Sequence, residues 1–303
     1  MPLENKLRIP VFQAPMFLIS GTEMVIEACR SGIVGSFPAP NARTLEDLES
    51  WLVQITSALE GDDNAAPWAI NLIMHRTNLR WEQDLELAVK YKAPIVISAL
   101  GSPKEAVAQV QAYGGKIYAD VNSPAFARKA ATTGVDGLAL VCSGAGGHTG
   151  QVSPFAFVEE VRSYWDGDII LAGAISSGRA IRAAEVLGAN YVYMGTRFIP
   201  TEESMALDGY KAMVIDSRAE DILCSDAITG VKANWMRDSL AAAGFDIANM
   251  PGAADIDFAK AAGDQKRWKD IWAAGQGVGV STEILKIADL VDQLEAEYQA
   301  ADQ

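Results

Sequence analysis

Short apolar segments alternate along this chain with segments of helical pattern, and this alternation restricts the possible folds more than any other feature. Near-continuous apolar strands are buried on both faces, as in a parallel sheet. Eight segments have this character: 11–14, 33–37, 68–72, 95–99, 116–121, 137–141, 169–172 and 191–194. Helices are predicted between them at 22–30, 44–59, 78–90, 103–112, 123–132, 154–164 and 177–187.

Eight strands with intervening helices predict an α/β protein, a (β/α)₈ TIM barrel. The competing fold is a doubly wound sheet, which carries a glycine fingerprint directly after its first strand. Here the first strand is followed by Pro15, Met16 and Phe17, and the glycines cluster after the last three strands. This distribution favours the barrel.

The regular alternation ends after the eighth strand. We expect residues 206–274 to form a helical subdomain that is inserted after strand eight and lies over the barrel mouth. The barrel itself would then comprise residues 1–205 and 275–303.

Composition excludes several classes of partner. The formal net charge is −14, and nucleic acids and anionic membranes repel an acidic surface. The three cysteines are widely spaced and form no Cys/His cluster, which predicts free thiols in a reducing compartment and no metal site. The N-terminus has no apolar leader, and no apolar run is long enough to cross a bilayer, so we expect a cytoplasmic protein.

A glycine-rich loop at 141–150 holds His148, one of only two histidines in the chain. Glycine allows a backbone to approach a ligand closely because it has no Cβ. Histidine has the side-chain pKa nearest to neutrality. The combination indicates a catalytic group in a binding loop; the alternative is a tight turn with a solvated histidine.

Two further glycine segments follow strands seven and eight, where barrels commonly bind a phosphate group. Both offer backbone N–H groups, and the first precedes a helix N-terminus, which attracts anions. This pair predicts a phosphate site at Gly173, Ala174, Gly195 and Thr196.

Two polar residues near the end of strand three are further candidates. Asn71 lies at the end of a buried strand, so its side chain must find a partner in the protein or in a ligand. His75 follows on the same rim, where a solvated position and a substrate contact both stay open.

Together these segments resemble the nitronate monooxygenase family, formerly called 2-nitropropane dioxygenases, which are FMN-dependent barrels. The matching stretches are Gln13-Ala14-Pro15-Met16, Ile70-Asn71-Leu72, Ala145-Gly146-Gly147-His148-Thr149-Gly150, Leu171-Ala172-Gly173-Ala174-Ile175-Ser176-Ser177-Gly178-Arg179 and Met194-Gly195-Thr196-Arg197-Phe198. The resemblance covers the whole barrel and is weaker over residues 206–274.

The resemblance implies a role for each matching residue. His148 would face the N5 side of the flavin, where it orients an anionic nitronate or acts as the base on a neutral nitroalkane. The expected flavin contacts are Pro15, Met16, Phe17 and Asn71 around the ring and Gly173, Ala174, Gly195 and Thr196 at the phosphate.

The chain departs from the family pattern at two positions. Gly144 stands where many relatives have Glu, and Asp120 stands where many have Lys. We include Asp120 among the expected cofactor-binding residues, because a carboxyl group there changes the field around an anionic substrate or flavin. A structural cap of the turn at 120–124 is the equally open alternative, since Asp and Asn are common turn residues.

Three functions follow as hypotheses. The leading one is an FMN-dependent oxidoreductase that oxidises alkyl nitronates, and on a wider reading nitroalkanes, with dioxygen. The alternative enzyme is an NAD(P)H-dependent flavin reductase of a quinone, an enoyl thioester or a related acceptor. The third is a non-catalytic flavin- or phosphate-binding module. An apolar patch on the helical segment would suit a homodimer, which the sequence alone does not establish.

Overall fold

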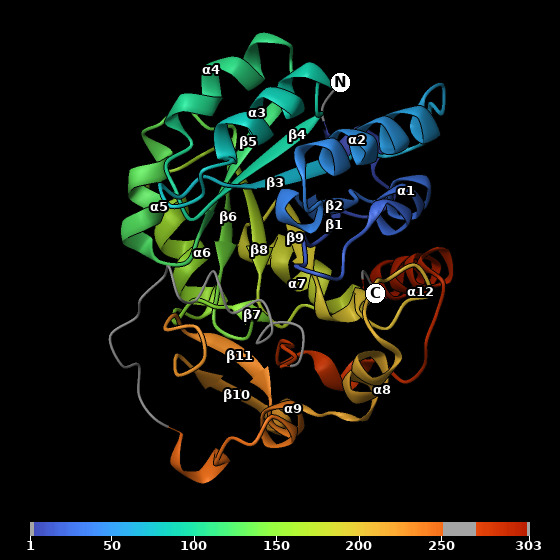
Figure 1. Cartoon of the computed structure of the whole chain (residues 1–303), viewed down its shortest axis with the longest axis vertical. Helices are drawn as coiled ribbons and strands as arrows, with labels where there is room; N and C mark the ends of the chain where they lie inside the picture. Colours follow the sequence, from blue (N-terminus) through green and yellow to red (C-terminus); the bar gives the residue numbers. More distant parts are fainter. Residues whose placement is uncertain (1–2, 251–270, 302–303) are drawn as a thin grey trace.

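Eight parallel strands form a closed barrel in the computed structural model, which describes residues 3–250 and 271–301 (Figure 1). The strands are hydrogen-bonded in the order β1, β9, β8, β6, β5, β4, β3, β2. A parallel bridge between Phe12 and Val34 joins the first strand to the segment before the second and closes the ring. The strands are β1 (Val11–Gln13), β2 (Ser36–Pro38), β3 (Ala69–Ile73), β4 (Ile95–Ala99), β5 (Lys116–Val121), β6 (Gly137–Val141), β8 (Asp168–Ala172) and β9 (Tyr191–Met194). The predicted TIM barrel is therefore confirmed.

Helices follow the strands and cover the outside of the barrel. Serine and threonine caps begin several of them, because a side-chain oxygen satisfies an N–H group that has no partner in the first turn. Thr44 forms a reciprocal capping box with Asp47, and Ser123 accepts a hydrogen bond from Phe126 N. The helices are α1 (Thr22–Arg30), α2 (Leu45–Leu59), α3 (Trp81–Lys90), α4 (Lys104–Ala112), α5 (Pro124–Ala131), α6 (Pro154–Arg162) and α7 (Gly178–Leu187).

The last helix, α12 (Ile287–Ala300), packs between α7 and α1. Gly178 permits the close approach of α7 and α12, since a Cβ there would lie 2.1 Å from the backbone nitrogen of Tyr298. The C-terminal helix thereby completes the outer ring.

The barrel interior is a separate packed cluster of inward-pointing side chains. Phe12 makes edge-on contacts with Tyr118, Tyr191 and Tyr193, with ring centroids 5.5–6.1 Å apart. Successive strand residues point to opposite faces, so the neighbours of these residues pack outward against the helices. The barrel is filled rather than hollow, and a ligand can enter only above its uppermost side chains.

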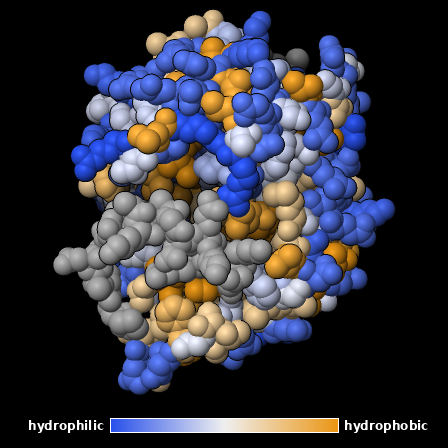
Figure 2. Space-filling model, viewed as in Figure 1, coloured by the Kyte–Doolittle hydropathy of each residue, from blue (hydrophilic) through white to orange (hydrophobic). Residues whose placement is uncertain are grey.

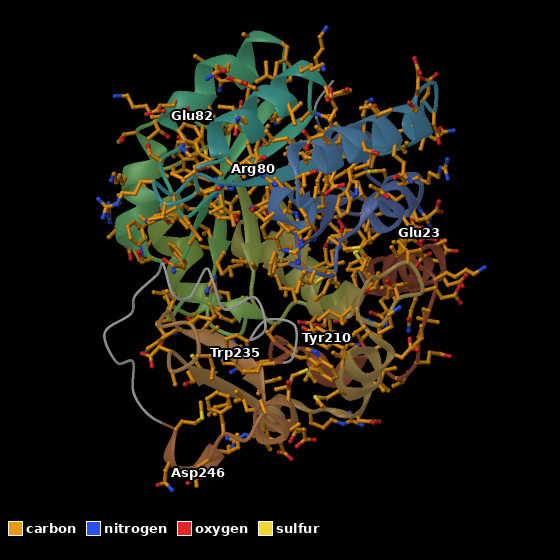
Figure 3. The ribbon with its side chains drawn as sticks, viewed as in Figure 1. Glu23, Arg80, Glu82, Tyr210, Trp235 and Asp246 are labelled. Carbon is orange, nitrogen blue, oxygen red and sulfur yellow. The ribbon has the colours of Figure 1, made fainter. Side chains whose placement is uncertain are left out.

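A second sheet lies beside the barrel, toward the lower side of Figure 1. It joins β10 (Ile222–Ser225), β11 (Ala233–Met236) and β7 (Gly147–His148), all antiparallel, and we call it the small sheet. The buried Trp235 and Leu240 form a core for this region, and Figure 3 shows Trp235 within it. Helices α8 (Asp208–Asp216) and α9 (Arg237–Ala242) complete the described part.

The expectation of a helical subdomain at 206–274 is wrong at β10 and β11. Both strands have only four residues, and β11 pairs with β7, which lies in a loop far earlier in the chain, so no local periodicity reveals them. The part of the prediction that falls on 251–270 lies outside the described residues. Where the structure describes helices, none is long and apolar enough to cross a membrane.

Candidate active site

The top layer of the barrel interior is polar. Asn71 on β3, Asp120 on β5 and Tyr193 on β9 share the inward face with the apolar residues beneath them. Asp120 and Tyr193 each lie next to the last residue of their strand, and Asn71 lies two residues before the end of β3. Asn71 Nδ2 donates a hydrogen bond to Asp120 Oδ2 at 3.0 Å, and the Tyr193 hydroxyl donates a long one to Oδ1 at 3.5 Å. The partner that Asn71 needed is therefore a carboxylate of this chain.

Burial determines the charge of this layer. It raises the pKa of Asp120 to about 7, and the hydrogen bonds from Asn71 and Tyr193 only partly oppose the rise. Burial, followed by the neighbouring Asp120, raises the pKa of the Tyr193 hydroxyl well above its usual value. The layer therefore holds one carboxyl group that changes its ionisation near neutral pH.

The glycine loop after β6 carries His148 into the small sheet, where His148 pairs with Ala233. Gly144 and Gly147 have φ angles of 89° and 62°, a left-handed conformation that suits glycine. The His148 side chain is open to solvent on one side, and the protein around it lowers its pKa because burial disfavours the charged imidazole. The neutral, basic form therefore prevails at physiological pH.

Contacts from distant segments hold this loop in place. The buried Asn234 on β11 donates from Nδ2 to Ala145 O at 2.7 Å, and Thr149 N donates to Lys232 O at 3.0 Å. Gln276 N donates to Gly144 O at 2.9 Å. The position of His148 therefore depends on the small sheet, and no local sequence pattern identifies Asn234.

The segments after β8 and β9 form a cradle of backbone amides. Gly173 has a φ of 141°, and a Cβ there would lie 2.8 Å from Ser143 O. Ala174 has a φ of 55°, a conformation that costs energy for a residue with a side chain and is characteristic of ligand sites. Within the described residues, the amides of Ala174 and Thr196 have no hydrogen-bond acceptor. These residues fit an incoming phosphate group.

The helix N-terminus beside this cradle is already occupied, contrary to expectation. Gly178 N donates to Glu297 Oε2 at 2.8 Å, and the Ser177 hydroxyl accepts from Ala180 N. The protein's own carboxylate on α12 thus takes the place of an external anion at α7. A phosphate group would rest on the amides of the two glycine segments and not on this helix.

The loop after β1 forms another wall of the mouth. Pro15, Met16 and Phe17 are half-buried, so part of each side chain is available to contact a ligand in the mouth. Two buried polar residues fix its backbone: Met16 N donates to Ser20 Oγ at 3.0 Å, and Asn41 Nδ2 donates to Met16 O at 3.0 Å. Sequence reasoning did not identify either residue, because a single Ser or Asn in a loop carries no pattern.

His75 follows β3 on the rim at the carboxyl end of the barrel. Its Nδ1 is 2.7 Å from Thr77 Oγ1, a contact within the same turn.

Figure 2 shows hydrophobic side chains in a hollow between the upper part of the molecule and the region of the small sheet. An apolar substrate body and a polar head group would both find complementary surface at this mouth.

The barrel, the polar mouth and the amide cradle are features of the class of TIM-barrel proteins that bind a phosphate-bearing ligand at the carboxyl ends of the strands. The chain belongs to the nitronate monooxygenase family, whose family model matches residues 3–297. The family takes its name from an oxidoreductase activity.

Two of the proteins that this chain resembles differ in the activity that their names state. The (3aS,4S,5R,7aS)-5-hydroxy-7a-methyl-1-oxo-octahydro-1H-indene-4-carboxyl-CoA dehydrogenase of Rhodococcus jostii (strain RHA1) is 26% identical over 222 residues, which cover 73% of this chain and 61% of that protein. A Staphylococcus haemolyticus (strain JCSC1435) protein named "Probable nitronate monooxygenase" is 30% identical over 190 residues, 56% of this chain and 52% of that protein. The chain thus matches less than two thirds of the length of either relative.

Among solved structures, the nitroalkane oxidase of Streptomyces ansochromogenes has the same fold. Its TM-score is 0.83 at 22% identity, with 99% of this chain and 98% of that chain covered.

Proposed function

We propose that this protein is an FMN-dependent oxidoreductase that oxidises alkyl nitronates, and nitroalkanes where His148 removes the α-proton, with dioxygen as the electron acceptor. The observation that carries the proposal is the convergence of three features on one mouth: the amide cradle at residues 173–174 and 195–196, the wall at Met16 and the loop of His148. FMN, when bound, would accept electrons from the substrate and pass them to dioxygen.

The chain's own residues would perform the remaining tasks. The amides of Ala174 and Thr196 would bind the phosphate, with Gly173 and Gly195 allowing its close approach. Pro15, Met16 and Phe17 would line the ring, and Asn71 and Asp120 would contact it from the top layer. His148 would orient a nitronate or take the proton from a nitroalkane.

One specific observation supports a second candidate function. The first of the two relatives carries a coenzyme A thioester in its name, so an NAD(P)H-dependent reductase of an enoyl thioester, quinone or related acceptor is the alternative.

One series of measurements separates these functions. The flavin released by denaturation is identified by mass, and we expect FMN rather than FAD because no second glycine fingerprint offers an adenylate site. The protein is then mixed with a propyl nitronate in air and, without oxygen, with NADH. Oxygen consumption with the nitronate supports the proposal, whereas rapid bleaching by NADH together with no nitronate turnover would favour the reductase.

Replacing Gly195 tests the phosphate cradle directly. A Cβ at this position would lie 3.3 Å from Met16 Sδ and 3.6 Å from Ala14 Cβ, so the larger Gly195→Val side chain must push into the mouth. We expect this variant to be purified without FMN, while Ala242→Val, at an exposed position on α9, keeps it. Full FMN occupancy in Gly195→Val would refute the placement of the phosphate.

A further inference from the structure

Asp120 is a carboxyl group at the top of the barrel, with no charged partner among the residues that the structure describes. Its side chain shares the inward face of β5 with Tyr118, which packs below it, so it opens only toward the mouth. Across the described residues no Lys, Arg or His forms an ion pair with it. Its negative charge is therefore poorly compensated.

The groups that face Asp120 can be named strand by strand. Asn71 on β3 and Tyr193 on β9 are neutral donors to its two oxygens. The strands beside β5 present apolar residues to the interior, Ile97 on β4 and Ala139 on β6. The nearest titratable group below, Tyr118, donates its hydroxyl to Asp168 at 2.7 Å and so is directed away from the top layer.

The loop of His148 follows β6, the strand next to β5, and the phosphate cradle follows β8 and β9. A flavin whose phosphate lies in that cradle and whose ring extends toward His148 would lie over Asp120. Any charge that the ring gains would then act on this carboxyl across a short path with little water, where charges interact strongly.

We propose that Asp120 is a redox-linked proton acceptor, whose carboxylate takes one proton from solvent when the bound flavin gains two electrons and returns it when the flavin is reoxidised. This rests on the proposed function, because it needs a flavin above the top layer. The electrons come from the nitronate or NAD(P)H and leave to dioxygen; the proton forms an O–H bond on Asp120 and later returns to water.

The expected pH range follows from the group itself. Burial raises the pKa of Asp120 to about 7 without the flavin, and added negative charge nearby raises it further. At about pH 8 the group is mainly ionised over an oxidised flavin and gains a proton on reduction. At about pH 5 it is protonated in both states, so no extra proton is taken up.

The test is the pH dependence of the two-electron midpoint potential of the FMN-loaded protein, which counts protons taken up on reduction. Above about pH 7 we expect wild type to take up one more proton per two electrons than Asp120→Asn. The midpoint potential of wild type should therefore fall more steeply, by about 30 mV per pH unit, which is a tenfold change in the equilibrium constant of reduction. Near pH 5 the two slopes should coincide. Glu105→Gln, which removes an exposed carboxyl on α4, should behave as wild type.

Tyr193→Phe gives a second, independent readout. It removes one donor to the carboxylate, so the steeper range should begin at a higher pH while the slope within it stays the same. If Asp120→Asn does not retain FMN, the bend in the wild-type plot and its displacement in Tyr193→Phe decide the question. Wild-type and Asp120→Asn plots that run parallel from about pH 5 to 9 would overturn the proposal while leaving FMN binding intact. A wild-type protein that binds no flavin would overturn the proposed function as well.

Discussion

At the scale of single residues, the proposed role of His148 as a base predicts different effects of its loss on neutral and anionic substrates. A nitroalkane must lose its α-proton, and a positioned general base contributes about 10²–10⁴-fold to such a step. We expect His148→Asn to lose this factor with nitroalkanes and to lose much less with nitronates, which are already deprotonated. The measurement is kcat/KM for both substrates, with His75→Asn as the control histidine. Equal losses on both substrates would show that His148 is not the base.

We expect the ionisation of the same residue to determine how nitroalkane turnover depends on pH. Burial lowers the pKa of His148, so its neutral, basic form persists to a lower pH than in an exposed histidine. The wild-type rate should therefore rise with pH through a midpoint below about 6.5, the ordinary value for histidine. This rise should be missing in His148→Asn; a rise that persists would assign the ionisation to another group, with Asp120 as the next candidate.

At the scale of elements, the pairing of β7 with β11 determines where the glycine loop lies. The buried Asn234 donates to Ala145 O at 2.7 Å, and its loss leaves that carbonyl without this donor. We expect Asn234→Ala to cost about 1–3 kcal/mol of stability. Hydrogen exchange at residues 145–150 should accelerate and kcat should fall, while the exposed Asn249→Ala changes neither. Unchanged exchange in this loop would mean that the small sheet does not hold it.

The barrel elements were predictable because their signals are local. Strands buried on both faces appear as continuous apolar runs, such as Ile95–Ala99, and capping residues such as Thr44 and Ser177 mark where helices begin. The strands β10 and β11 were not predictable. Each is short and includes polar residues, and the small sheet is completed by the pairing of β11 with β7, a contact between segments far apart in the chain.

The residues of the candidate site likewise divide into those that the sequence predicts and those that it does not. The predicted strand at 68–72 indicated Asn71, the resemblance to the family indicated Asp120, and glycine clustering indicated the segments at Gly173 and Gly195. The occupied N-terminus of α7 could not be foreseen, because Glu297 comes from the opposite end of the chain. Which hydrogen-bond groups stay available to a ligand depends on the tertiary structure.

At the scale of the whole molecule, the mouth is assembled from segments that meet only in the folded protein. The loop after β6 contacts β11 on one side and the segment at Gly275 and Gln276 on the other. Thr196 Oγ1 accepts a hydrogen bond from Gly275 N at 2.8 Å, so the cradle and the glycine loop share a neighbour. The stability of the fold and the shape of the site are therefore coupled.

This coupling predicts how global stability depends on pH. The folded-state pKa of Asp120, about 7, lies above its ordinary value of 3.8, so the group favours folding when protonated, and this contribution is lost as pH rises from about 4 through 7. Asp120→Asn keeps a neutral side chain at every pH. In the flavin-free proteins, we expect the variant to gain stability relative to wild type between about pH 5 and 8, by at most about 4 kcal/mol at 1.36 kcal/mol per pKa unit. Urea unfolding of both proteins at each pH measures the difference. A difference that does not change with pH would show that the carboxyl of Asp120 titrates as an ordinary exposed group, and that the top layer imposes no cost on its charge.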